Sequence, residues 1–246
     1  MEAGEETDEG GRARIGLVLP SINTVVEPWF GRVIPRGVSV HTARMLLGPH
    51  LSAENIIKMD ETEGAAAITQ IASCRPASIA YCCTASSVVQ GSAYDEHLRS
   101  QITQRTGIKA TTATHAILSA LNALGARKIC VVSPYTDEVD ELEHRFFVDA
   151  GFDLVGSANL AISDTFNLAS PTSSTLLALA RRGWRPDADA LVITCLNTRS
   201  HFVVDAIERE IQKPVVTSTT ATLWHALRLA GINDAIAGYG RLLKEG

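Results

Sequence analysis

The sequence predicts an α/β protein of two pseudo-symmetric lobes, each a parallel sheet flanked by helices, with an active site in the cleft between them. Short continuous apolar runs alternate with longer amphipathic runs, a pattern typical of parallel strands that helices bury on both faces. Segments of the first half also recur, in the same order, in the second half. A chain of 246 residues with 46% hydrophobic residues can bury a core of that size.

Strand-like runs mark equivalent places in the two halves. Residues 14–21 read RIGLVLPS and residues 128–135 read KICVVSPY, and an acidic amphipathic segment follows each of them. A second pair of strand-like runs covers 77–83 and 190–195, where an Arg-Pro pair precedes each run and a cysteine ends it. The shared order indicates that the two halves have one topology.

The last helix of each half is predicted to end at a glycine. These glycines are Gly125 and Gly231, and glycine suits the left-handed backbone that ends a helix. We therefore expect one lobe over 14–122 and a second over 123–230. The remaining segment, 231–246, is expected to return and pack on the first lobe.

Charge and hydropathy exclude several classes of protein. The 22 basic and 27 acidic residues give a net charge of −5 and no basic patch, so we expect no nucleic-acid partner. Residues 1–13 are predicted to be a disordered acidic tail. The longest apolar runs are strand-sized, far short of the roughly 20 residues that a bilayer requires, so we expect no membrane partner. No signal peptide is visible, and we expect a cytoplasmic protein.

The five cysteines form neither a disulfide framework nor a metal site. Their number is odd, no secretory signal accompanies them, and the sequence has no C-x-x-C or H-x-x-x-H spacing, so we expect no metal. Cys82 is expected to point to the opposite face of its strand from Cys83. We interpret Cys74, Cys82 and Cys130 as packing residues.

Cys83 and Cys195 end equivalent predicted strands, one in each half. Ligands of open α/β sheets bind beyond the carboxyl ends of the strands, so we expect one thiol to reach the cleft from each side. Thr84 and Asn197, which follow the two cysteines closely, offer hydrogen-bond donors for a substrate. If helices begin there, their N-termini should lower the pKa of the thiols.

The chain resembles the aspartate/glutamate racemase superfamily, in particular its maleate cis–trans isomerase and arylmalonate decarboxylase branch. The resemblance spans about residues 14 to 240. It is carried by six segments, namely RIGLVLPSINTVVE (14–27), HTARM (41–45), AYCCT (80–84), SPYTDE (133–138), TCLN (194–197) and PVVTS (214–218).

The resemblance implies roles for three further residues. Asn23 would hold one substrate carboxylate, Tyr135 would donate its hydroxyl to a carboxylate, and Asn167 is a weaker match to a substrate-binding asparagine. Each of them also has a structural interpretation: Asn23 as a helix cap, Tyr135 as a packed ring and Asn167 as a turn residue. Glu27 and Arg44 also match the pattern, and we expect Glu27 to be structural.

The resemblance implies an enzyme that needs no cofactor and acts on a small dicarboxylate or α-carbon acid. We expect isomerisation of maleate, or a close cis-enedioate, to fumarate through a covalent adduct on Cys83, with Cys195 as the acid on the opposite face. Decarboxylases of the branch carry glycine in place of the first cysteine, so Cys83 favours isomerisation or racemisation over decarboxylation.

Other functions remain open. One alternative is a two-cysteine racemase of an amino acid, hydantoin or similar acid, and others are an arylmalonate-type decarboxylase and a small-molecule binding protein. Relatives suggest a homodimer or a higher homo-oligomer.

Overall fold

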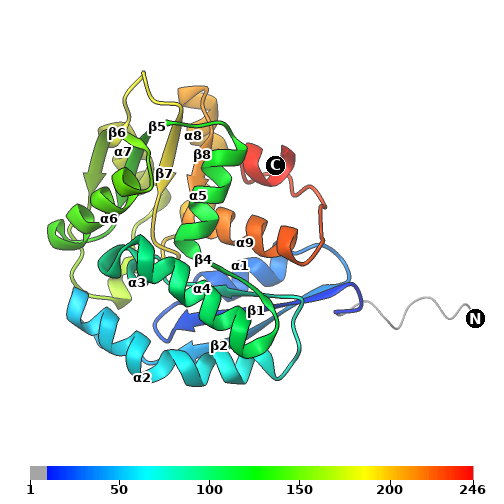
Figure 1. The fold of residues 1–246 in the computed structure, drawn as a ribbon. Helices are drawn as coiled ribbons and strands as arrows, with labels where there is room; N and C mark the ends of the chain where they lie inside the picture. Colours follow the sequence, from blue (N-terminus) through cyan, green and yellow to red (C-terminus); the bar gives the residue numbers. More distant parts are fainter. Residues whose placement is uncertain (1–9, 246) are drawn as a thin grey trace, which may run out of the picture.

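The computed structural model describes residues 10–245 and contains two parallel sheets of four strands each. One sheet lies in the lower half of the molecule and the other in the upper half (Figure 1). The strand order is β2-β1-β3-β4 in the first sheet and β6-β5-β7-β8 in the second, so the two sheets have the same topology. The predicted α/β class with two similar sheets is confirmed.

The elements around the first sheet run from residue 13 to residue 123. They are β1 (Ala13–Pro20), α1 (Val26–Val33), β2 (Val38–Met45), α2 (Ala53–Ala72), β3 (Ser78–Tyr81), α3 (Thr84–Gln90), α4 (Ser92–Thr106), β4 (Lys109–Thr112) and α5 (Ala113–Ala123).

The elements around the second sheet follow in the same order. They are β5 (Lys128–Ser133), α6 (Asp137–Asp149), β6 (Asp153–Asn159), the 3-10 helix η1 (Phe166–Ala169), α7 (Ser173–Gly183), β7 (Ala190–Ile193), the 3-10 helix η2 (Ser200–Phe202), α8 (Val204–Ile211), β8 (Val215–Thr217) and α9 (Ser218–Leu229). A last short helix, α10 (Arg241–Glu245), closes the described chain.

The apolar run of β1 is continuous because helices cover both faces of its sheet. Ile15, Leu17 and Leu19 pack into one core cluster, whereas Val18 points the other way into a second cluster. Successive side chains of a strand alternate between the two faces of the sheet. A strand that is buried on both faces therefore carries apolar side chains at successive positions.

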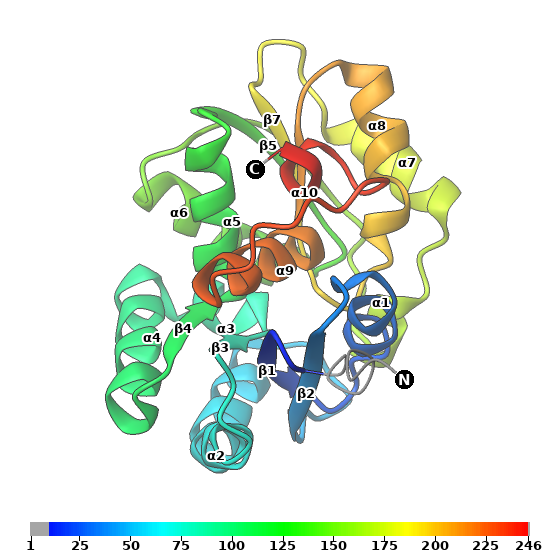
Figure 2. The same cartoon turned by 90° about the vertical axis from the view of Figure 1, so that its right-hand side faces the viewer.

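Helices α5 and α9 lie between the two sheets and pack on each other (Figure 2). Each begins at a threonine that ends the preceding strand: the Thr112 hydroxyl accepts a hydrogen bond from His115 N–H, and the Thr217 hydroxyl accepts one from Thr220 N–H. After each helix the chain turns at a glycine with left-handed φ, +68° at Gly125 and +78° at Gly231, as predicted.

Two histidines meet where α5 and α9 pack together. The rings of His115 and His225 lie 5.0 Å apart, and the Thr111 hydroxyl is 2.9 Å from His225 Nδ1. Burial, with His115 beside it, lowers the pKa of His225 to about 4. In the folded protein the imidazole of His225 therefore stays neutral at pH values well below the ordinary pKa of histidine.

This histidine should make the protein less stable in weak acid. In the unfolded chain His225 takes up a proton near its ordinary pKa of about 6.5, whereas in the folded chain it does so only near pH 4. The neutral ring therefore contributes its full share to the free energy of unfolding above about pH 7, and this contribution is lost as the pH falls. Between pH 7.5 and pH 5, wild type should lose up to about 2 kcal/mol more than His225→Gln. Urea denaturation at the two pH values measures this difference, and equal losses in both proteins would contradict it.

The segment that follows α9 contacts both lobes. Arg12 pairs with Asp234 at 2.6 Å, and the ring of Tyr239 meets the edge of Trp29 at 5.0 Å. Helix α10 packs on α9 and β8. Residues 1–9 of the predicted acidic tail lie outside the described residues. The lobe boundaries at 14–122 and 123–230 stay a prediction.

None of the helices between residues 10 and 245 is both long enough and apolar enough to cross a membrane.

Candidate active site

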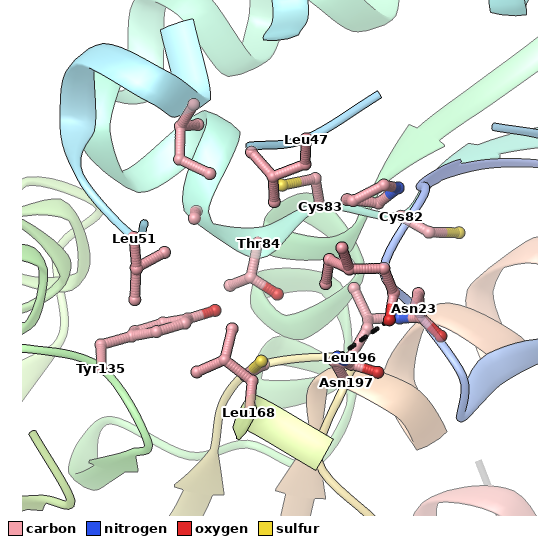
Figure 3. Close-up of a pocket in the computed structure, with 15 residues that line it drawn as sticks. Asn23, Leu47, Leu51, Cys82, Cys83, Thr84, Tyr135, Leu168, Leu196 and Asn197 are labelled. Atoms are coloured by element: carbon pink, nitrogen blue, oxygen red, sulfur yellow. Dashed lines mark hydrogen bonds between the residues drawn. The ribbon is translucent and has the colours of Figure 1, made fainter. Parts of the chain in front are cut away.

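A pocket opens where the strand ends of the two lobes meet. Both Cys83 and Cys195 line it, together with Asn23, Thr84, Tyr135 and Asn197 (Figure 3). These residues come from loops that follow β1, β3, β5 and β7, the central strands of the two sheets. Six of the seven residues proposed from the sequence therefore share one pocket.

Cys83 stands at the junction between β3 and α3. The strand ends at Tyr81, two residues earlier than predicted, and Cys83 is the N-cap residue of α3 with an extended φ of −133°. The side chain of this cysteine is almost completely buried, with the residue 6% exposed. The hydroxyl and the backbone N–H of Ser86, in the first turn of α3, oppose the rise in the pKa of its thiol, although the Cys83 side chain makes no capping hydrogen bond.

Cys195 follows β7 in a strained turn. The strand ends at Ile193, and Cys195 has a left-handed φ of +73°, which is uncommon for a residue other than glycine. No α-helix begins directly after it; instead the N–H groups of Asn197 and Thr198 and the hydroxyl of Tyr135 favour the thiolate form and so lower its pKa against the effect of burial. This turn aims the thiol into the pocket.

Burial dominates the electrostatics of both thiols. It raises the pKa of Cys83 to about 12, with the nearby Asp60 carboxylate adding to the rise. It raises the pKa of Cys195 to about 12 as well, although hydrogen bonds from Asn197 and Tyr135 oppose the rise. The sequence-based expectation of a lowered thiol pKa is wrong, because desolvation of the thiolate outweighs the donors that face it.

Asn23 and Tyr135 present one polar group each to the pocket. The Asn23 carbonyl oxygen caps α1 by accepting the N–H groups of Val25 and Val26, both at 3.0 Å, which leaves the amide NH₂ as the group free to donate. Burial and the nearby Cys195 raise the pKa of Tyr135, so its phenol stays neutral and donates. In Figure 3 the Tyr135 hydroxyl points between Thr84 and Leu168.

Glu27 and Arg44 shape the turn that carries Asn23. Arg44 forms an ion pair with Glu27 and donates to the carbonyl oxygens of Ser21 and Asn23, at 2.8 and 3.0 Å. Neither side chain lines the pocket. Glu27 is therefore structural, as predicted.

Thr84 and Asn197 connect the two lobes at the pocket. The Thr84 hydroxyl donates to Ser218 Oγ at 3.0 Å, and the Asn197 carbonyl oxygen accepts the N–H of Thr24 at 3.0 Å. The Asn197 amide also donates to the carbonyl oxygen of Ile22 at 3.4 Å. Asn197 thus holds the loop of Asn23 from the opposite lobe.

Asn167 is not among the residues that line the pocket, and its role in substrate binding stays a prediction. It is exposed in η1, where Asp164 Oδ1 accepts its backbone N–H at 3.0 Å and its side chain accepts the Ser170 hydroxyl at 3.3 Å. The short helix turns the next side chain, Leu168, toward the pocket instead. The turn-residue interpretation describes its position.

Two acids near the cysteines, the half-buried Asp60 and the buried Glu143, were not predicted from the sequence. Asp60 on α2 raises the pKa of Cys83, and Glu143 on α6 raises that of Cys195. Glu143 is completely buried and accepts the Thr194 hydroxyl at 3.0 Å through Oε2. Burial and the adjacent Asp140 raise the pKa of Glu143, which favours a neutral carboxyl group.

The rest of the pocket wall is apolar. It is formed by Pro20, Ile22, Leu47, Leu51, Ile56, Cys82, Ala85, Leu168 and Leu196. None of the described lining residues is a lysine, arginine or histidine, so an anionic substrate must be held by neutral hydrogen-bond donors. Within residues 10–245, no cluster of His, Cys, Asp or Glu side chains is arranged to hold a metal ion.

Comparison with known proteins agrees with this geometry. The family model described as arylmalonate decarboxylase matches residues 22–243, which is nearly the whole described chain. The chain belongs to the arylmalonate decarboxylase family. Because the similar characterised proteins are enzymes, this member of the family is an enzyme too.

Relatives in this family differ in the reaction they catalyse. An arylmalonate decarboxylase from Bordetella bronchiseptica is 32% identical over 165 residues, covering 66% of this chain and 69% of the relative. A maleate isomerase from Nocardia farcinica is 28% identical over 245 residues, covering 96% and 97%. The chain therefore resembles both a decarboxylase and an isomerase of the arylmalonate decarboxylase family.

A solved structure extends the resemblance to the active-site chemistry of one relative. It is a mutant of the Nocardia farcinica maleate cis–trans isomerase with a covalently bound succinylcysteine intermediate. It superimposes on this family member with a TM-score of 0.90 at 27% identity, covering 95% of this chain and 98% of the relative.

Proposed function

We propose that the protein isomerises maleate, or a close cis-enedioate, to fumarate through a covalent adduct on a cysteine. The observation that carries the proposal is the pair of buried thiols, Cys83 and Cys195, lining one pocket from different lobes. The near-complete coverage by a maleate isomerase and the succinylcysteine of a structural relative support it.

The reaction begins at Cys83. Its thiolate attacks one alkene carbon, a carbon–sulfur bond forms, and the electron pair of the double bond moves to the neighbouring carbon and its carboxylate. The amide of Asn23 and the hydroxyl of Tyr135 stabilise that negative charge, because they are uncharged donors fixed in a largely apolar pocket. Cys195 acts on the opposite face as the acid that protonates the carbanion.

The former double bond is now a single bond and can rotate. Return of the proton to Cys195 and departure of the Cys83 sulfur restore the double bond in the trans geometry. Every atom of maleate appears in fumarate, and both thiols end in their starting state. Thr84 and Asn197 keep the two lobes together during this cycle through their cross-lobe hydrogen bonds.

The test combines product analysis with intact-protein mass. Maleate in heavy water should give fumarate by NMR, and a quenched sample should contain protein heavier by one maleate. Deuterium exchange at the α-carbon of an amino acid or hydantoin, with no adduct, would favour the racemase instead and contradict the proposal.

Arylmalonate decarboxylation is the second candidate, because the apolar wall of Leu47, Leu51, Ile56 and Leu168 suits an aryl group and a decarboxylase is 32% identical. Release of carbon dioxide from phenylmalonate, without fumarate formation from maleate, would favour it.

Tyr135→Phe should reduce kcat by about 100-fold or more. The substitution removes one hydroxyl aimed at the reacting centre, and loss of one such donor typically costs about 3 kcal/mol in the transition state. Initial rates of fumarate formation measure the loss. Tyr239→Phe, which removes a hydroxyl far from the pocket lining, should leave the rate unchanged, and equal rates for both variants would contradict the role of Tyr135.

A further inference from the structure

A second pocket lies between α1 and the segment around η2, separate from the active-site pocket. Among the residues that line it are Thr24, Trp29, Arg32, Arg199, His201 and Phe202. We call it the arginine pocket, because two arginines and no described aspartate or glutamate line it. The active-site pocket has the opposite character, since no lysine, arginine or histidine is among its described lining residues.

The two arginines have no acidic partner in the part of the chain that the structure describes. Arg32 lies in the last turn of α1 and Arg199 immediately precedes η2, and both are exposed. Neither forms an ion pair with an aspartate or glutamate between residues 10 and 245. Arg199 donates one hydrogen bond, to the carbonyl oxygen of Ala169, and a guanidinium group has five N–H donors. Most of these donors are therefore unused by the described residues.

The ring of His201 is the buried polar part of the pocket wall. The residue is 2% exposed, and its ring stacks on Trp29 with the centroids 4.5 Å apart, while the Phe202 ring lies 4.2 Å away. Neither ring nitrogen of His201, nor Nε1 of Trp29, has a hydrogen-bond partner among the described residues. A neutral imidazole has one N–H group, and a buried donor without an acceptor destabilises a protein. The wall thus contains donors that lack an acceptor.

Positive charge surrounds this ring. Arg32, Arg199 and His201 line the same pocket, and burial together with the two arginines lowers the pKa of His201 to about 4. The imidazole is therefore neutral at ordinary pH. An anion that enters the arginine pocket meets two positive charges, a neutral N–H donor and no described acidic side chain of the lining.

The wall also indicates the class of anion. A guanidinium group binds a carboxylate through parallel N–H donors, which gives both affinity and a fixed orientation. Beside the arginines, the rings of Trp29 and Phe202 supply apolar area, and Phe202 is 51% exposed. Exposed aromatic area next to two cations suits a ligand that joins a carboxylate to an apolar group. Inorganic phosphate would use the arginines and leave the rings without a contact.

We propose that the arginine pocket binds a small carboxylate that carries an apolar group. The carboxylate lies between Arg32 and Arg199 and accepts the N–H of His201, and the apolar group packs against Phe202. This site is distinct from the cysteine pocket, so the inference does not rest on the proposed function.

The arginine pocket shares two turns of the chain with the active site. Asn23 and Asn197 line the active-site pocket, whereas Thr24 and Arg199, close to them in the chain, line the arginine pocket. The Thr24 N–H donates to Asn197 Oδ1 at 3.0 Å and so joins the two turns. Because one turn follows β1 and the other follows β7, a carboxylate held by both arginines connects segments that follow different sheets. Its binding should stabilise the pairing of the turns that carry the two asparagines.

The test is isothermal titration calorimetry with sodium benzoate in a buffer of low ionic strength, because salt screens exposed charges. The wild-type protein should bind one benzoate per chain. Arg32→Gln and Arg199→Gln should each weaken binding by about tenfold or more, because each removes charge-assisted hydrogen bonds. His201→Phe keeps an aromatic ring against Trp29 and removes the N–H donor, and it should weaken binding by about threefold or more.

Arg145→Gln is the matched control. Arg145 is an exposed arginine on α6 that is not among the lining residues of either pocket. The variant removes the same charge at another place on the surface, so benzoate should bind to it as tightly as to the wild type.

Three outcomes would overturn the proposal. Absence of saturable benzoate binding would exclude the site. Binding that Tyr135→Phe weakens and Arg32→Gln does not would place the benzoate in the active-site pocket. Phosphate that binds as tightly as benzoate, with the same loss in both arginine variants, would show that the pocket recognises charge alone. None of these measurements uses maleate, so failure of the proposed isomerase activity would leave the carboxylate site standing.

Discussion

Cys83→Ser should lower kcat/KM for maleate by at least about 10³-fold. A serine hydroxyl is a far weaker nucleophile than a thiolate at neutral pH, and an alkoxide is a poorer leaving group, so both addition and elimination are lost. The oxygen fits the space of the sulfur at the start of α3, so the fold should persist. Fumarate formation and intact mass measure the effect, and no adduct should form.

Cys74→Ser is the control for this substitution. Cys74 follows α2 and is not among the residues that line the pocket; its sulfur donates to the carbonyl oxygen of Ile71, so the variant should keep wild-type turnover. A Cys83→Ser variant that retained a tenth of wild-type kcat/KM would exclude Cys83 as the nucleophile.

Cys195→Ser should separate the two halves of the reaction. Cys83 can still add to maleate, but the acid on the opposite face is lost, so turnover should fall by about 10²-fold or more while the adduct accumulates. Intact mass should increase by one maleate, and peptide mapping should place the increase on Cys83. An adduct on Cys195 in the Cys83→Ser variant would reverse the two roles.

The doubled architecture could be predicted because parallel strands leave a clear trace in sequence. Strands buried on both faces read as continuous apolar runs, and each half begins with such a run and ends with a helix that stops at glycine. Thr112 and Thr217 are predictable in kind, since a threonine between a strand and a helix is a common cap. The repeat then implied that the cysteines of the two halves would meet.

The local geometry of the site could not be predicted in the same way. Both cysteine strands end two residues earlier than the apolar runs suggest, and Cys195 has a positive φ that no residue-type preference indicates. The sequence also did not show that Asn167 would be exposed in η1 and that Leu168, the next residue, would line the pocket. The thiol pKa values depend on burial, which a sequence shows only indirectly.

Asp60 left a signal that periodicity could have revealed. It lies four residues after Ile56 and four before Gly64, so all three share one face of α2, on which Ile56 and Gly64 are buried. The neighbouring Glu61 and Glu63 make the stretch look like a solvated charged face. An acid on the apolar stripe, rather than beside it, distinguishes Asp60 from its neighbours.

The side chains that react and the side chains that enclose them belong to different parts of the chain. The thiols sit in turns after β3 and β7, while Leu47, Leu51 and Leu168 come from loops that carry none of the reacting atoms. Trimming or enlarging those leucines changes the shape of the cavity and leaves the sulfur atoms where they are. Substitutions in these segments can thus enlarge the pocket for bulkier acids, one segment at a time, while the two cysteines are kept.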